Sequence, residues 1–190
     1  MKVSLGAKPL AQPCPVWMVG SYDAEGQPNV MCAAWGGIVS SKPVSIGVSV
    51  RPSRYTYANI MERKAFTISV ANVSVAKEAD YFGLVSGKNV DKFAATGMHA
   101  VKSDLVDAPY IEEFPLVIEC KLSQVVEVGL HHQLIGEVID IKIDEEFQTD
   151  GTPDIAALQP LIFGTGNRAY HGIGEYVGKP FDIGKVFVKD

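Results

Sequence analysis

Residues 44–50 read VSIGVSV, an unbroken alternation of apolar and small side chains. Successive side chains of an extended chain point to opposite sides, so the apolar residues share one face and Ser45, Gly47 and Ser49 share the other. The small face carries almost no bulk, so a covering strand or loop, or a planar ligand, can lie close to its backbone. The stretch predicts a half-buried strand of an antiparallel sheet.

The residues on either side of this stretch continue the strand pattern. Residues 15–22 and 28–35 predict two strands joined as a hairpin by Asp23-Ala24-Glu25-Gly26, while the Gly-, Ser- and Pro-rich residues 36–37 and 40–43 are interpreted as turns. Pro52 ends the strand at 44–50, and a helix is predicted from Arg54 to about Lys64 with Ser53 as its N-cap. Residues 65–71 alternate again and predict a fourth strand.

The second half of the chain predicts a broken helix followed by two long strands. The helical pattern runs from Ser74 to Phe93 and is lost near Ser86-Gly87, and short strands are expected near 98–102. Leu116–Val128 and Gln133–Asp144 are expected to pair across a turn at 129–132. The expected buried side chains of the second long strand are Ile139, Ile141 and Ile143, with Asp140, Lys142 and Asp144 in water.

This succession of elements indicates a mainly β fold. About six sequential strands with two inserted helices leave too few helices for repeated βαβ crossovers, so a small closed antiparallel barrel flanked or capped by helices is expected. No repeat, low-complexity block or long linker interrupts the 190 residues, and 47% of them are hydrophobic. A single domain over residues 1–190 is therefore predicted.

Composition excludes several classes of protein. With 17 basic against 22 acidic residues, the net charge of −5 disfavours broad binding of nucleic acid. No apolar run reaches the ~20 residues of a membrane span, and Lys8, Pro9 and Pro13 interrupt any signal-peptide pattern. Three cysteines without a CxxC spacing argue against a disulfide framework or thiolate metal site. We expect a cytoplasmic protein.

The first candidate site is the start of the predicted helix, where Arg51 and Arg54 lie close together. A helix N-terminus is partly positive, so two cations there are unfavourable unless an anion lies between them. With free backbone N–H groups and the hydroxyls of Ser53 and Thr56, the segment could hold a phosphate. The alternative is a capped helix with solvated arginines.

The second candidate is the strand at 28–35. Strand parity places Asn29, Met31, Ala33 and Trp35 together and assigns Val30, Cys32 and Ala34 to the barrel side. An amide, a thioether and an indole could wall an aromatic heterocycle. The alternative is that the Trp and Met belong to the core or to an interface.

The stretches DAEGQPNVM (23–31), AAWGGIVSS (33–41) and VSVRPSRYT (48–56) resemble the flavin reductase-like family of FMN-binding split barrels, and in particular its flavoredoxin members. The likeness continues more loosely through 86–92 and 129–136. It implies a Greek-key-like split barrel and a homodimer that holds one non-covalent FMN per subunit near the subunit interface.

The resemblance also implies roles for individual residues. The residues that would contact the flavin ring are Asn29, Met31 and Trp35, and those at the phosphate end are Arg51 and Thr56 with Arg54 beside them. Polar contacts would come from Ser86 and Lys92. His131 would approach from the turn between the long strands, and Phe163 would add an aromatic contact. A cation near the reduced ring, such as Lys92 or a protonated His131, would favour the reduced state.

The expected function is electron transfer through bound FMN, because the flavin carries the redox chemistry and the protein supplies binding and orientation. Three alternatives stay open: an NAD(P)H-dependent flavin reductase, a carrier that exchanges electrons with another redox protein, and a flavin-binding protein without turnover. No catalytic side chain is predicted. The dispersed histidines lack carboxylate or Cys partners at ligand spacing, so no metal site is predicted, and His99 is interpreted as a surface or structural residue.

Overall fold

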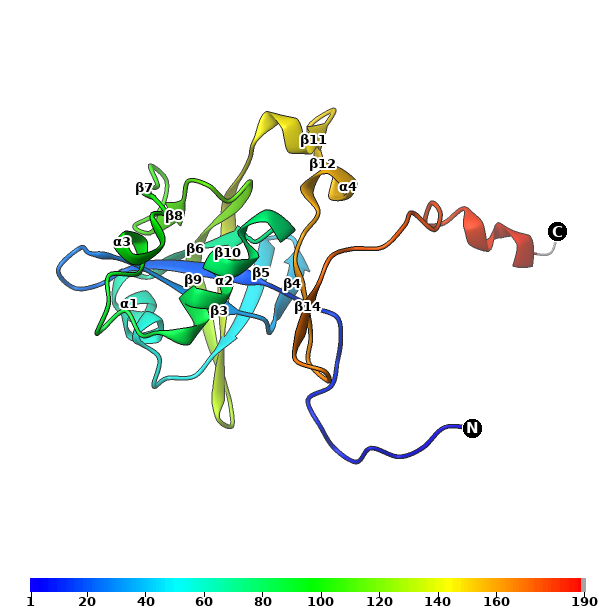
Figure 1. The fold of residues 1–190 in the computed structure, drawn as a ribbon, viewed down its shortest axis with the longest axis horizontal. Coiled ribbons are helices and arrows are strands. Elements are labelled where there is room, and N and C mark those ends of the chain that lie inside the picture. Colours follow the sequence, from blue (N-terminus) through cyan, green and yellow to red (C-terminus); the bar gives the residue numbers. More distant parts are fainter. Residues whose placement is uncertain (189–190) are drawn as a thin grey trace.

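The computed structural model describes residues 1–188, so the last two residues of the predicted domain lie outside the described part. A seven-stranded antiparallel sheet dominates it (Figure 1). Its order is β3-β2-β6-β9-β10-β5-β4. The strands are β2 (Trp17–Tyr22), β3 (Pro28–Ala33), β4 (Gly36–Ser41), β5 (Val44–Val50), β6 (Ala65–Val70), β9 (Leu116–Val128) and β10 (His131–Ile143).

The two edge strands of this sheet, β3 and β4, follow each other directly in the sequence, with only residues 34–35 between them. The sheet must therefore curl until the end of β3 meets the start of β4. The backbone N–H of Ser49 donates to the carbonyl of Trp35 at 2.8 Å at this point. The predicted antiparallel barrel is confirmed.

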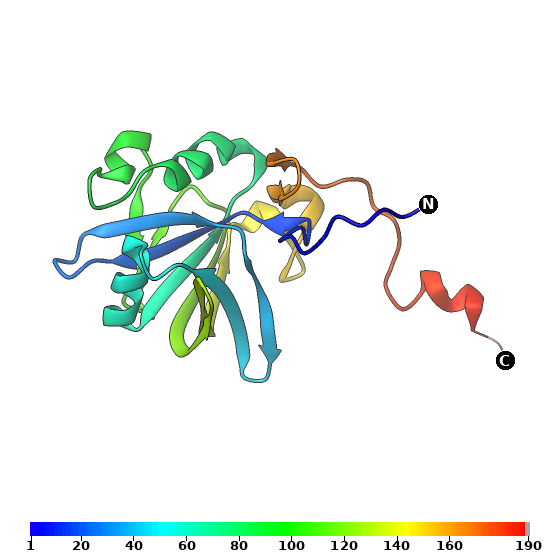
Figure 2. The same ribbon diagram turned by 90° about the horizontal axis from the view of Figure 1, so that it is seen from below.

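The helices α1, α2 and α3 lie together on one side of the barrel, whereas α4 lies near the side from which the N-terminal and C-terminal segments extend (Figures 1 and 2). The helices are α1 (Tyr55–Arg63), α2 (Ala76–Leu84), α3 (Lys92–Thr96) and α4 (Ile155–Leu158), with 3-10 turns at Val73–Val75, Glu145–Phe147 and Ile183–Phe187. Short pairings join β1 (Cys14–Pro15) to β13 (Ile162–Gly164) and β14 (Ala169–His171), β7 (Ala100–Lys102) to β8 (Pro109–Ile111), and β11 (Gln148–Thr149) to β12 (Thr152–Pro153). No described helix combines the length and apolarity needed to cross a bilayer.

The core has two parts, one inside the barrel and one between β2, β3 and the helices α2 and α3. Phe66, Ile68 and Leu134 lie in the first, and Met18, Phe82 and Phe114 lie in the second. Successive residues of β3 alternate between the two parts. Met31 and Ala33 contact the barrel interior, whereas Val30 and Cys32 face the helices, so the predicted parity is confirmed and the predicted sides are wrong.

The prediction of turns at 36–37 and 40–41 is also wrong, because β4 spans Gly36–Ser41. Glycine disfavours strands, but here it is needed: a Cβ on Gly36 would lie 2.2 Å from the Trp17 ring. The strands at 44–50 and 116–128 have the predicted bounds. The predicted break in the second helix is wider than expected, since α2 ends at Leu84 and α3 starts at Lys92.

The far end of the β9–β10 hairpin reverses the predicted faces. The register between these strands shifts between Val138 and Asp140. Ile139 and Ile141 are 37% and 50% exposed, against the prediction that both are buried. The buried face of β10 is set by the even-numbered residues before them, since Leu134 and Gly136 are buried and Val138 packs against the barrel core. On β9, Glu119 is fully buried and ion-paired with Lys142.

Candidate functional site

Two adjoining hollows run along the edge strand β3 and share Met31, Cys32 and Arg54. The α1 hollow, about 240 Å³, lies between β3, the start of α1 and the end of α2. The Trp35 hollow, about 280 Å³, lies between β3, the end of β5 and the start of β10. Every predicted site residue except Phe163 lines one of them. The α1 hollow contains Asn29, Met31, Arg54, Thr56, Ser86 and Lys92, and the Trp35 hollow contains Met31, Trp35, Arg51, Arg54 and His131.

A buried hydrogen-bond network fixes the floor of the α1 hollow. The Asn29 amide Nδ2 donates to Thr56 Oγ1 at 2.8 Å and lies 3.4 Å from Ser21 Oγ. The Asn59 amide donates to the same serine at 3.2 Å. The loop after α2 passes close over this network, because a Cβ on Gly87 would lie 2.0 Å from Asn29 Oδ1. Asn29 is thereby grouped with Thr56 and not with Trp35.

The start of α1 has the character of an anion site. The helix begins one residue later than predicted: its N-cap is Arg54 in place of Ser53, and no side chain caps its N-terminal N–H groups. The Arg54 N–H donates to the Arg51 carbonyl at 2.9 Å, and this turn brings the two exposed arginines side by side. Uncapped N–H groups, the helix dipole and two guanidinium groups together favour a negatively charged ligand.

The Trp35 hollow presents an exposed aromatic wall. Trp35 is 40% exposed, and its ring centroid lies 4.9 Å from that of His131 at a tilt of 48°. Arg51 Nε lies 3.4 Å from His131 Nε2 and donates to it, which requires an unprotonated nitrogen there. Burial, aided by the Arg51 charge, lowers the pKa of His131. This shift favours the neutral form of His131 at neutral pH.

Lys92 has a structural contact that the sequence did not indicate. Its side chain is 4% exposed, and Nζ donates to the carbonyls of Val30 at 2.8 Å and Phe82 at 2.7 Å. The ammonium group thus ties α2 to β3 behind the α1 hollow. Burial lowers its pKa to about 8.

Phe163 lies apart from both hollows. It is on β13, paired with Cys14, and its ring packs against the core part under α2 and lies 5.8 Å from Tyr170. Sequence reasoning missed Cys32 and the residues around Ser86, namely Gly83, Leu84, Val85 and Gly87, which do line the α1 hollow. Strand parity assigned Cys32 to the core; because β3 is an edge strand, however, its end is open to both hollows. Burial raises the pKa of the Cys32 thiol to about 12, so this thiol stays protonated.

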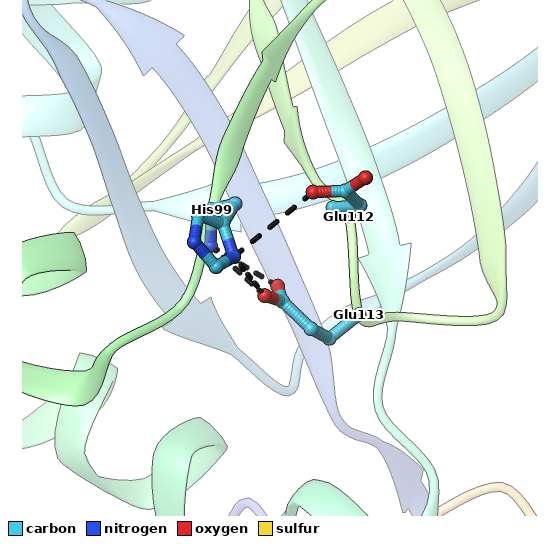
Figure 3. A group of neighbouring side chains, drawn as sticks. All are labelled: His99, Glu112 and Glu113. Carbon is cyan, nitrogen blue, oxygen red and sulfur yellow. Dashed lines mark hydrogen bonds and ion pairs between the residues drawn. The ribbon is translucent and has the colours of Figure 1, made fainter.

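Away from the hollows, His99 has a carboxylate partner that its spacing in the sequence did not indicate. Its Nδ1–H donates to Glu113 Oε1 at 2.6 Å, and Glu112 lies 4.0 Å away (Figure 3). His99 precedes β7 and the two glutamates follow β8, so the β7–β8 pairing holds the group together. The side chains of His99 and Glu112 are largely exposed and that of Glu113 is partly buried, and an ion pair accounts for the arrangement.

This ion pair predicts a pH-dependent stability. The hydrogen bond to Glu113 raises the pKa of His99 above its ordinary value of 6.5. A raised folded-state pKa contributes stability that is fully present below about 6.5 and is lost as pH rises through the raised value. We expect wild type to melt at a higher temperature than His99→Gln at pH 5.5 and at the same temperature at pH 9, in thermal unfolding followed by circular dichroism. Glu113→Gln should reproduce the pattern; a difference that persists at pH 9 would contradict it.

Comparisons with known proteins show the family of the chain. The family model described as "Flavin reductase like domain" matches residues 11–173. The flavoredoxin of Desulfovibrio vulgaris (Miyazaki F) is 49% identical, with a TM-score of 0.93 over 97% of this chain and 100% of that one. Flavoredoxin from Methanosarcina acetivorans is 28% identical, with a TM-score of 0.89 over 99% of this chain and 98% of the other. An uncharacterized protein of Archaeoglobus fulgidus is 33% identical over 129 residues, which is 68% of this chain and 72% of the relative. The chain belongs to the flavin reductase-like domain family.

Proposed function

We propose that the protein binds FMN non-covalently along β3 and transfers electrons through it, with NAD(P)H or a redox protein as the donor. The observation that carries the proposal is the pair of connected hollows, one with the uncapped start of α1 and Arg54, the other with an exposed indole. The similarity to two flavoredoxins supports it. When bound, the flavin supplies the redox chemistry, accepting and releasing electrons.

The residues of the hollows fit such a ligand. The α1 hollow offers guanidinium, hydroxyl and backbone N–H donors, which are the groups that bind a phosphate. The Trp35 hollow offers Met31 and Trp35, which can contact a flat ring. The division of the hollows changes one predicted role: Asn29, bonded to Thr56, belongs with the phosphate and ribityl end and not with the ring.

The remaining side chains orient the ligand. Lys92 holds α2 against β3 and contributes a positive charge at the edge of the α1 hollow. His131, kept neutral and held by Arg51, presents an imidazole beside the indole of Trp35. We further propose a homodimer in the cytoplasm, in keeping with the free cysteines Cys14, Cys32 and Cys120.

The function is tested by mixing the FMN-loaded protein anaerobically with NADH or NADPH and following the flavin absorbance. Rapid bleaching supports an NAD(P)H-dependent reductase. Bleaching only after a reduced redox protein is added supports an electron carrier, for which the exposed Trp35 edge is an accessible point of transfer. A protein that is isolated colourless and takes up no FMN in titration would overturn the proposal.

The close passage of Gly87 predicts a loss of FMN affinity on adding one methyl group. Gly87→Ala places a Cβ 2.0 Å from Asn29 Oδ1 and 3.3 Å from the Tyr55 ring, so the amide must shift and its bond to Thr56 is disturbed. We expect FMN to dissociate about tenfold more readily, equivalent to one hydrogen bond, as measured by fluorescence titration. Gly37→Ala, whose Cβ would meet nothing within 4 Å, is the control. Equal affinities of the two variants would contradict the assignment.

A further inference from the structure

The C-terminal arm, residues 172–188, leaves the body after β14 and extends into solvent (Figures 1 and 2). Its aromatic side chains are almost fully exposed: Tyr176 84%, Phe181 98% and Phe187 86%. Val177, Ile183, Val186 and Val188 are also exposed. Among the described residues, the hydrogen bonds made by 174–188 stay within the arm.

This composition is not that of a solvated tail. Disordered tails are poor in aromatic and β-branched residues, whereas this arm is rich in both. Each buried aromatic side chain covers about 150–250 Å², so the three aromatic residues of the arm alone would bury about 450–750 Å². A standard interface buries about 800 Å² per partner. One arm from each of two chains therefore provides the area that a stable dimer needs.

A receiving surface lies on the same side of the molecule from which the arm leaves (Figure 1). Strand β4 is at the end of the sheet order. The side chains of Ile38 and Val39 on β4 are 84% and 48% exposed, and that of Val44 at the start of β5 is 51% exposed. Next to it lies the proline hollow, about 540 Å³, which includes Pro13, Pro15, Trp35, Gly36 and Gln133. This surface combines an unpaired strand edge, exposed aliphatic side chains and a hollow with an apolar wall, which suits an extended apolar segment.

The proline hollow is continuous with the candidate site. It shares Ala34, Trp35 and Ser49 with the Trp35 hollow. A segment seated in it would cover the outer side of the Trp35 indole and close this end of the site to water. In one chain this end of the site is open, since Trp35 is 40% exposed.

We propose that the C-terminal arm of each chain lies along β4 of a second copy and places an aromatic side chain in that copy's proline hollow. Exchange of two identical arms is reciprocal, so it closes a two-fold dimer and covers the apolar surface of both chains. The inference rests on the homodimer proposed above and names the segment that holds it together and completes the site.

Sedimentation equilibrium of the FMN-loaded protein tests this inference. We expect a dimer for the full chain, and a dissociation constant raised at least about 100-fold both in a chain ended after Ile173 and in the full-length double variant Phe181→Asp/Phe187→Asp. The matched control is Val3→Asp/Leu5→Asp, which charges equally exposed residues of the N-terminal segment, 78% and 60% exposed, and should leave the dimer intact. A monomeric full chain, or a dimer unaffected by loss of the arm, would overturn the inference.

Cross-linking distinguishes exchange from folding back onto the same chain. Chains carrying Phe181→Cys are mixed with differently tagged chains carrying Ile38→Cys and oxidised. Exchange gives a covalent heterodimer, and mass spectrometry should show that its disulfide joins the two new cysteines. A third chain that carries both substitutions tests folding back. A disulfide that forms within this third chain and not between the two mixed chains would overturn exchange. Flavin absorbance is recorded in parallel. A colourless dimer that needs its arm refutes the FMN proposal alone, and a yellow monomer refutes the arm alone.

Discussion

Arg54→Ala is expected to weaken FMN binding by about 10- to 100-fold while changing the affinity for riboflavin, which lacks the phosphate, by less than about twofold. Arg54 is the N-cap of α1 and lines both hollows. A charge-assisted hydrogen bond to a phosphate contributes about 1.5–3 kcal/mol, and about 1.4 kcal/mol corresponds to a factor of ten in affinity. The measurement is fluorescence titration of the apoprotein with the two flavins.

The comparison of the two flavins separates a phosphate contact from a general disturbance of the site. Arg168→Ala removes the same charge from an exposed position outside both hollows and should leave both affinities unchanged. An equal loss for FMN and riboflavin would place Arg54 beside the ring. No loss for either would exclude the start of α1 as the phosphate site.

Lys142→Ala is expected to lower the free energy of unfolding by about 2–3 kcal/mol. It removes the ion-pair partner of Glu119, whose side chain is fully buried between β6 and β10 and whose Oε1 accepts no hydrogen bond from any described residue. Breaking a buried pair costs about 3–5 kcal/mol. Because Lys142 is 39% exposed, water reaching the site reduces that cost. Urea denaturation followed by circular dichroism measures the change.

A double variant shows whether the buried charge is the cause. Glu119→Gln removes the charge at nearly constant volume, so Lys142→Ala/Glu119→Gln should recover most of the loss. Lys121→Ala, an exposed lysine on the same strand as Glu119, should change stability by less than about 0.5 kcal/mol. A double variant as unstable as Lys142→Ala would show that the lysine stabilises the sheet in another way.

Local sequence pattern predicted the strands whose two faces differ. The alternation in 44–50 and the length of 116–128 follow from burial of one face, and the sequence alone shows this. It could not show β4, because Gly36 is required by the Trp17 ring, which comes from another strand. Nor could it show that Ile139 and Ile141 are exposed, since the face of β10 that is buried depends on the elements packed against it and not on the strand's own residues.

In the candidate site, too, local sequence predicted the residues that are close along the chain and missed those brought in by contacts between distant segments. Arg51, Arg54 and Thr56 are close in sequence around one helix start, so local reasoning found them. Cys32 and Gly87 enter the α1 hollow only because α2 and its following loop pack across β3, a contact between distant segments. Lys92 was named from the family resemblance, but its two carbonyl partners are visible only in three dimensions.

The connection between β3 and β4 has a consequence for stability. The Trp35 hollow lies where β3 passes into β4, and the α1 hollow adjoins it along β3. Strand pairing is interrupted at this connection, so local opening of the barrel would begin there. A ligand bound there would hold the strands on either side of this connection together. A ligand that binds only the native state adds about 2.7 kcal/mol to the free energy of unfolding at a ligand concentration one hundred times the Kd. The empty protein should therefore be cut first by proteases near residues 34–35, and filling the site should protect that bond.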